Sequence, residues 1–216
     1  MGRILALIIG YLFGMILMGY LIGKSKNIDL TKVGSGNVGS TNTMRNLGVS
    51  AGLITLLWDC FKCVVAVFFV WLIFGFFFDD VEIFKVYAGL GVVLGHDFPF
   101  YMHFKGGKGI ASTLGFIIAL FPMGLPIPAC VFILIVALTR YVSLGSILGV
   151  LSFAIEMLVF AHFGLLTPPY AGAELTEVLI ICCIVSLIGI CLHHANIGRL
   201  INGNENKFSF HPETRA

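Results

Sequence analysis

The sequence GHDFPFYMHFKGGKGIASTLG, residues 95–115, decides how this chain is arranged. It places a basic, glycine-rich loop, FKGGKG at residues 104–109, between two long apolar segments. Glycines let backbone N–H groups approach an anion, and the N-terminus of a following helix adds partial positive charge. Long apolar segments are typical of membrane helices. The stretch therefore predicts a phosphate-binding loop at the surface of a membrane.

Composition sets the class of protein. The chain has 216 residues, of which 58% are hydrophobic and 11% are charged, and its mean hydropathy is +1.01. Soluble domains carry roughly 25% charged residues, so a water-soluble fold is excluded. We expect a single all-α, polytopic membrane domain over residues 1–216, with a polar tail from about residue 202. Its surroundings are membrane lipid, and nothing indicates a nucleic-acid partner.

Apolar segments along the chain predict about seven membrane helices, and several of them are near the ~20 residues needed to cross a bilayer. Their approximate bounds are 4–23, 49–78, 84–100, 110–123, 125–139, 142–163 and 175–192. The fourth and fifth are short, with three prolines near their junction. They form either a broken hairpin that crosses twice or a pair of which one is re-entrant.

Lysine and arginine predict the orientation, because they concentrate in cytoplasmic loops. With alternating loops, one side collects Lys24, Lys26, Lys32, Arg45, Lys105, Lys108, Arg140, Arg199, Lys207 and Arg215. The other side has only Arg3 and Lys85. We therefore expect the N-terminus outside and the C-terminus in the cytoplasm. The first span is longer than a typical signal-peptide core and lacks an A-x-A-like site after it, so we expect it to remain as a membrane span.

Six cysteines lie mostly within the apolar segments. Cys60 and Cys63 form a C-x-x-C pair, but no second pair completes a zinc-binding set. Cysteine in such a position is typically a small packing residue. We expect no disulfide, no metal and no cofactor.

Four polar segments emerge on the predicted cytoplasmic side. The first, GSGNVGSTN at residues 34–42, is followed by Arg45, which suits bidentate contact with phosphate. The second is the FKGGKG loop, the third contains Ser143 and Ser146, and the fourth contains His193, Asn196 and Arg199. Each alone is compatible with an ordinary flexible loop or a basic membrane anchor. Their coincidence on one side indicates a shared anion site.

The strings GSGNVGSTN, FKGGKG and HHANIGRLINGNENK resemble the three motifs of the bacterial acyl-phosphate:glycerol-3-phosphate acyltransferases. The resemblance covers almost the whole chain. It implies a seven-helix enzyme of the bacterial inner membrane with a cytoplasmic active site. The implied reaction transfers a fatty acyl group from acyl phosphate to the 1-hydroxyl of glycerol 3-phosphate, giving lysophosphatidic acid and phosphate. This is the first acylation step of phospholipid synthesis, and it implies no acyl-CoA, carrier protein or metal.

The resemblance also implies site residues. The implied catalytic residues are Ser35, Arg45, Lys108, His193 and Asn196. The implied substrate-binding residues are Gly34, Gly36, Asn37, Thr41, Asn42, Lys105, Gly106, Gly107, Gly109, Ser143 and Arg199. Ser146 is an alternative to Ser143. Val38 and Ser40 depart from the proline and alanine that the family often has, which puts the rigidity of the first loop in doubt.

Two apolar segments contain charged residues well away from their ends: Asp59 and Lys62 in 49–78, and Glu156 in 142–163. A charge at the centre of a membrane helix costs about 2.5–3.5 kcal/mol on insertion scales. Asp59 and Lys62, three residues apart, are expected to pair as a structural unit, with a direct catalytic role as the alternative. Glu156 must face the protein interior or meet a partner that the sequence does not name.

The implied substrates suggest the mechanism. Several cations would offset the repulsion between two anions, and loop N–H groups would stabilise the oxyanion. No histidine here has an aspartate five residues later, so the H-x-x-x-x-D chemistry of other glycerolipid acyltransferases is absent. His193 is the candidate general base. We favour instead a donor phosphate that takes the proton, with His193 and Asn196 holding the substrate. The competing function is a membrane transporter for an organophosphate anion, and no protein partner is indicated.

Overall fold

The computed structural model describes residues 1–166 and 169–208, and over these ranges the chain contains helices and no strand. The elements are α1 (Gly2–Gly14), α2 (Met18–Ser25), α3 (Ser40–Leu47), α4 (Val49–Phe74), α5 (Glu82–Asp97), η1 (Phe100–Met102), α6 (Ile110–Leu120), η2 (Pro122–Gly124), α7 (Pro126–Thr139), α8 (Val142–His162), α9 (Gly172–Cys191) and α10 (His194–Ile201). The all-α class is confirmed. The end of the predicted tail, including Arg215, lies outside the described residues.

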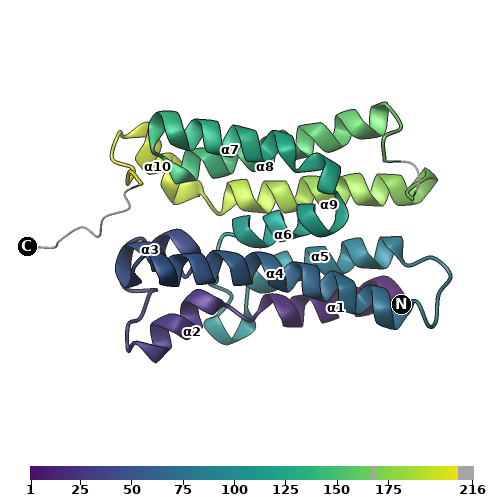
Figure 1. The fold of residues 1–216 in the computed structure, drawn as a ribbon, viewed down its shortest axis with the longest axis horizontal. Coiled ribbons are helices and arrows are strands. Elements are labelled where there is room, and N and C mark those ends of the chain that lie inside the picture. Colours follow the sequence, from purple (N-terminus) through teal and green to yellow (C-terminus); the bar gives the residue numbers. More distant parts are fainter. Residues whose placement is uncertain (167–168, 209–216) are drawn as a thin grey trace, which may run out of the picture.

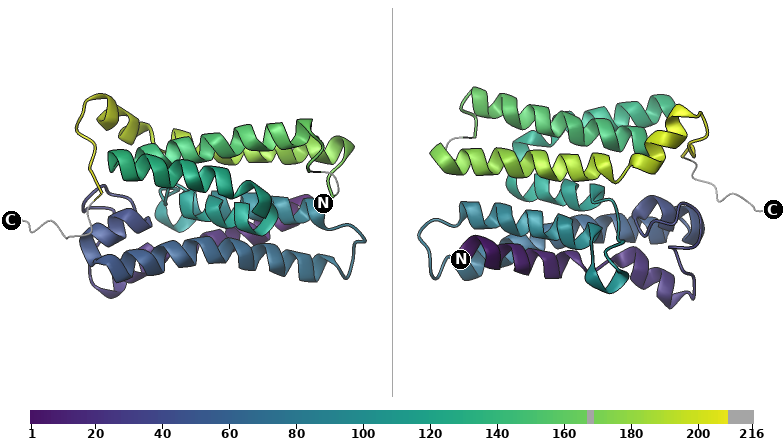
Figure 2. Two further views of the ribbon diagram at one scale, coloured as in Figure 1. Left: turned by 45° about the horizontal axis from the view of Figure 1, so that its top comes forward. Right: turned by 180° about the vertical axis from the view of Figure 1, so that it is seen from behind.

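The long helices run side by side in two groups (Figure 1). Helices α1, α4 and α5 pack together, α7, α8 and α9 form the other group, and the short α6 lies between them. The small helices α3 and α10 lie at one end of the bundle, and the N-terminus lies at the opposite end (Figures 1 and 2). Segments from both halves of the chain therefore meet where the predicted motifs are.

The lengths of the helices and their exposed apolar side chains are suited to a membrane. Five segments in the described ranges are long and apolar enough to cross one: Gly2–Ser25, Val49–Phe74, Pro122–Thr139, Val142–His162 and Gly172–Cys191. Large apolar side chains on them, such as Leu57 and Leu138, point outward and are exposed. A polytopic membrane protein is confirmed. The 16-residue α5 is mostly buried among its neighbours, whereas the 11-residue α6 covers about 16 Å, roughly half of a ~30 Å hydrocarbon core.

The predicted first span is not one helix but is interrupted between α1 and α2, at residues 15–17. An interruption frees backbone carbonyls that lipid cannot satisfy. Lys62 of α4 satisfies them, because its Nζ donates to the carbonyl oxygens of Gly14 at 2.8 Å and Ile16 at 3.2 Å. Lys62 also pairs with Asp59 at 2.9 Å, and both side chains are 1% exposed. The predicted structural pair is confirmed, and its position explains the broken helix.

Glycines allow α1 and α5 to pack with their backbones in contact. A Cβ at Gly10 would overlap the carbonyl of Ala88, and a Cβ at Gly91 would overlap the carbonyl of Leu7. Small residues at such crossings are typical of helices packed in lipid. The close contact fixes the C-terminal end of α5, from which the FKGGKG loop departs.

Candidate active site

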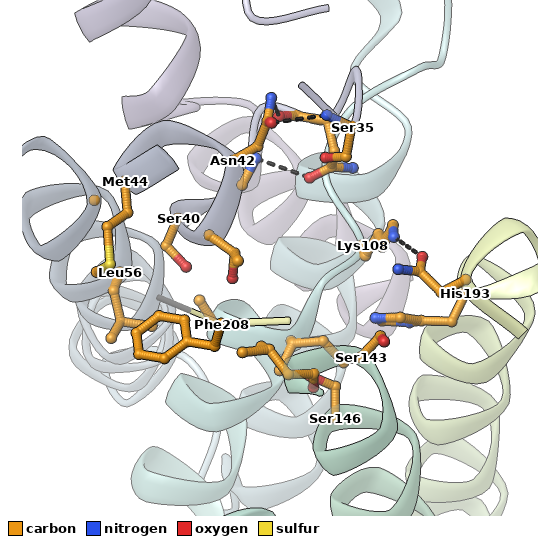
Figure 3. Close-up of a pocket in the computed structure, with 18 of the residues that line it drawn as sticks. Ser35, Ser40, Asn42, Met44, Leu56, Lys108, Ser143, Ser146, His193 and Phe208 are labelled. Carbon is orange, nitrogen blue, oxygen red and sulfur yellow. Dashed lines mark hydrogen bonds between the residues drawn. The ribbon is translucent and has the colours of Figure 1, made fainter. Parts of the chain in front are cut away.

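One cavity of about 350 Å³ opens at the end of the bundle that carries α3 and α10 (Figure 3). It is lined from the first polar loop and α3, the start of α6, the start of α8, α10 and the segment 205–208. The predicted site residues that line it are Ser35, Asn37, Thr41, Asn42, Arg45, Lys108, Gly109, Ser143, His193, Asn196 and Arg199. Four segments far apart in sequence thus form a single site. Ser146, the alternative to Ser143, lines it as well.

Five predicted residues do not line this cavity. Gly34 and Gly36 have φ of 61° and 70°, so they form the turns of the first loop. The N–H groups of Gly106 and Gly107 donate to the carbonyl oxygens of Asp97 and His96, each at 2.9 Å, and are not free to contact an anion. Lys105 is exposed and lines a separate, open cavity beside Tyr20 and Lys24.

The phosphate-suited N–H groups are instead those of the first turn of α6. Gly109, with φ of 72°, is the residue before the helix, and Ile110 and Ala111 line the cavity. The first N–H groups of a helix have no partner within it and favour an anion. The predicted helix start after the loop is correct.

Asn42 organises the first loop from a buried position. Its side-chain amide donates to the carbonyl oxygens of Leu30, Val33 and Asn37 at 3.2, 3.1 and 2.8 Å. Its Oδ1 accepts the N–H of Ser35 at 2.9 Å. Because these hydrogen bonds are all made within the protein, the main role of Asn42 is to fix the conformation of the loop.

Arg45 is available to bind a ligand. Its guanidinium lines the cavity and makes no ion pair with any residue of the described ranges. Ser35 and Thr41 line the same cavity, and their hydroxyls likewise make no hydrogen bond within the described ranges. A planar cation with neighbouring hydroxyl donors suits the oxygens of a phosphate.

Glu205 joins the second, third and fourth polar segments, and it is not among the site residues predicted from the sequence. Its carboxylate accepts from Ser143 Oγ at 3.0 Å, Asn196 Nδ2 at 2.7 Å and Arg199 Nε at 2.7 Å. Asn196 Oδ1 in turn accepts from Lys108 Nζ. The side chain of Glu205 is 5% exposed, so it is part of the site and not of a free polar tail. An acidic residue within the cation-rich string HHANIGRLINGNENK was the available signal.

Burial changes the titration of two groups here. Burial and the charge of Arg199 lower the pKa of Lys108 to about 8, so the ammonium is largely charged at neutral pH. Burial and the charge of Lys108 lower the pKa of His193 to about 4. His193 is therefore neutral, and its Nδ1–H donates to the carbonyl of Gly189 at 2.7 Å. Its Nε2 then carries a lone pair that accepts a hydrogen bond.

The cavity also has an apolar wall. Leu56 of α4, Phe132 and Val136 of α7, and Val142 of α8 line it beside the polar groups. Cations, hydroxyls, helix-start N–H groups and an apolar wall in one cavity suit a phosphorylated, lipid-like ligand. A family model described as glycerol-3-phosphate acyltransferase matches residues 4–203.

The chain belongs to the glycerol-3-phosphate acyltransferase family. A glycerol-3-phosphate acyltransferase of Thermosipho melanesiensis is 41% identical over 207 residues, which are 96% of this chain and 93% of that protein. Glycerol-3-phosphate acyltransferase 2 of Thermotoga maritima is 43% identical over 209 residues, 96% and 97% of the two chains. The predicted family and the acyltransferase class are confirmed.

Crystal structures of PlsY, an integral membrane glycerol 3-phosphate acyltransferase, are also similar to this acyltransferase. The glycerol 3-phosphate form has a TM-score of 0.81 at 33% identity and covers 97% of this chain and 96% of that one. The lysophosphatidic acid form has a TM-score of 0.78 at 32% identity, with 97% of both chains covered. The similarity extends over almost the whole chain.

Proposed function

We propose that this acyltransferase transfers a fatty acyl group from acyl phosphate to the 1-hydroxyl of glycerol 3-phosphate. The products are lysophosphatidic acid and phosphate, the first acylation step of phospholipid synthesis, and no metal takes part. The observation that carries the proposal is a single cavity lined by both cations and apolar side chains. The similar PlsY has a glycerol 3-phosphate form and a lysophosphatidic acid form, which correspond to the proposed acceptor substrate and product.

Two anionic substrates must approach each other for this reaction. Arg45 on α3 and Lys108 before α6 supply separate positive charges to the cavity, which offset the repulsion between the two phosphates. The apolar side chains of α4, α7 and α8 suit the acyl chain, whose carbonyl then lies near the polar wall. Holding both substrates in this geometry supplies a large part of the acceleration.

In the chemical step, the hydroxyl oxygen of glycerol 3-phosphate attacks the acyl carbon. A new ester C–O bond forms, the bond from the acyl carbon to the phosphate oxygen breaks, and phosphate leaves with the hydroxyl proton. The N–H groups at the start of α6 suit the oxyanion that develops on the carbonyl. Neutral His193, with its Nε2 lone pair, orients the hydroxyl, and a pKa near 4 makes it a weak base. These properties support transfer of the proton to the donor phosphate.

His193→Gln is expected to keep more activity than His193→Ala, because glutamine retains hydrogen-bonding capacity. The pH dependence of kcat/KM should keep its shape in the glutamine variant. Because the pKa of His193 is near 4, its titration should give no limb in the pH profile at pH 6–7. Activity should fall instead as pH rises through about 8, because Lys108 then loses its charge. Equal inactivity of both variants, together with loss of a limb at pH 6–7, would identify His193 as the base.

We also propose the seven-span topology, with the cavity facing the cytoplasm of a bacterial inner membrane. The five long helical segments, together with the buried α5 and the short α6, support a count of seven spans. At the end opposite the cavity, both cations are paired: Arg3 with Glu177 at 2.8 Å and Lys85 with Glu82 at 2.7 Å. The lysines and arginines of the other described loops lie at the cavity end, and this bias supports a cytoplasmic location.

Cysteine labelling of intact cells should follow this topology. In a variant without the six native cysteines, single cysteines at Ser35, Lys108 or His193 should escape a membrane-impermeant maleimide. A cysteine at Asp80 should react with it, and permeabilised cells should show labelling at all four positions. Labelling of the Lys108 position from outside intact cells would contradict the orientation.

Purified protein in detergent should form lysophosphatidic acid from acyl phosphate and glycerol 3-phosphate, and excess EDTA should not slow it. Lysophosphatidic acid is followed by mass spectrometry, with acyl-CoA as the comparison donor. Turnover with acyl-CoA but not with acyl phosphate would contradict the proposed donor. Uptake of glycerol 3-phosphate into proteoliposomes without product would favour the transporter.

A further inference from the structure

His96, one residue before the end of α5, lies beneath the FKGGKG loop and is outside the predicted site. It is 2% exposed and lines the cavity together with Asp59. A Cβ placed on Gly107 would overlap the imidazole of His96, with Nε2 as the nearest atom. The ring is therefore in direct contact with the residue that precedes Lys108.

The contacts of Lys62 determine which nitrogen of His96 carries the proton. Lys62 Nζ has three oxygen acceptors: Gly14 O at 2.8 Å, Ile16 O at 3.2 Å and Asp59 Oδ1 at 2.9 Å. Three acceptors require a fully protonated ammonium, which has no lone pair. His96 Nδ1, 2.9 Å from the same Nζ, is a fourth acceptor that shares one of the three N–H groups, because an ammonium cannot accept from an Nδ1–H. The imidazole is neutral and carries its proton on Nε2.

The Nε2–H of His96 has no hydrogen-bond partner among the residues of the described ranges. Because His96 lines the cavity, this N–H is available to an acceptor on a ligand held there. The cavity that His96 lines also contains Lys108, Arg45 and the start of α6, all of which favour a phosphate. An anionic oxygen is the acceptor that these surroundings select.

We propose that His96 is a further substrate-binding residue, which donates its Nε2–H to a phosphate oxygen held in the cavity. Lys62 and Asp59 are positioning residues that fix its tautomer from inside the bundle. The phosphate belongs either to glycerol 3-phosphate or to acyl phosphate, and the inference rests on the proposed function for that choice.

Two amide variants separate binding from structure. In His96→Gln the amide nitrogen reaches the place of Nε2, so the donor to the cavity is kept. In His96→Asn the amide oxygen takes the place of Nδ1, so an acceptor for Lys62 is kept and the donor is lost. Lys62 retains its three oxygen acceptors in both, so both are expected to fold, which thermal unfolding in detergent checks.

We expect His96→Asn to lose roughly 10- to 100-fold in kcat/KM, the effect of one hydrogen bond to a charged group, and His96→Gln to retain most of it. A rise in KM for glycerol 3-phosphate alone assigns its phosphate, and a rise for acyl phosphate alone assigns the donor. His162→Asn, at an exposed position far from the cavity, is the control. Equal activity of the two variants, or a larger loss for glutamine, would overturn the proposal.

A measurement on the wild-type protein stands independently of the variants and of the acyl donor. With ¹⁵N-labelled histidine, His96 should give a buried, non-titrating Nε2–H signal, distinct from buried His193, which carries its proton on Nδ1. The signal should shift when glycerol 3-phosphate or acyl phosphate is added. An unchanged signal with both would overturn the proposal. Absence of turnover with acyl phosphate, in contrast, would overturn only the proposed function.

Discussion

Lys108→Ala is expected to lower kcat/KM by about 10²–10³-fold, the effect of removing one donor aimed at developing charge. Lys108 is the lysine that the cavity contains, and it is linked through Asn196 to Glu205. The loss should therefore exceed that of an ordinary basic residue at the membrane surface. Acyl transfer by purified protein, with both substrates varied, measures it.

Lys105→Ala is the matched control, because it removes the same charge from the same loop. Lys105 is exposed in a separate cavity, so its replacement should change kcat/KM much less. Similar losses for the two lysines would mean that only the overall charge of the loop matters. Near-normal turnover of Lys108→Ala would contradict its assignment to substrate phosphate.

Gly107→Val should be nearly as severe, although valine removes no charge. Any side chain at this position collides with the imidazole of His96, which Lys62 and Asp59 hold in place. The loop must then move away, and Lys108 moves with it. A displacement of about 1 Å is sufficient for a 10²-fold loss of activity. Expression and membrane insertion should be unchanged, since the bundle itself is not altered.

Gly198→Val on α10 provides the control for this substitution. A Cβ at Gly198 meets no atom within 4 Å, so the same change of residue should be tolerated there. Activity and the amount of protein in membranes are measured for both variants. Normal turnover of Gly107→Val would show that the loop does not depend on contact with His96.

Local patterns predicted much of the fold and of the site. The apolar segments gave the bounds of α4, α7, α8 and α9 to within a few residues, because continuous apolarity directly reflects a lipid environment. The three motifs gave the family, and most of the predicted site residues line one cavity. Only a few residue types bind phosphate well, namely glycine, hydroxyl, amide and basic residues, so a phosphate site can be recognised from a short sequence motif.

Long-range contacts explain what was missed. The break between α1 and α2 depends on Lys62, 46 residues after Ile16, so the apolar run alone predicted an unbroken helix. The N–H groups of Gly106 and Gly107 were predicted to bind phosphate, but they donate hydrogen bonds to the carbonyl oxygens at the end of α5. His96 and Glu205 acquire their roles only from partners on other helices.

The buried ammonium of Lys62 also constrains how the protein is made. Its acceptors come from the α1–α2 junction, from α4 itself and from α5, so three separate segments must be present before it is satisfied. Inserted alone, α4 would place charged groups in lipid at about 2.5–3.5 kcal/mol each. The nascent chain therefore gains from retaining α4 beside the translocon until α5 has been synthesised.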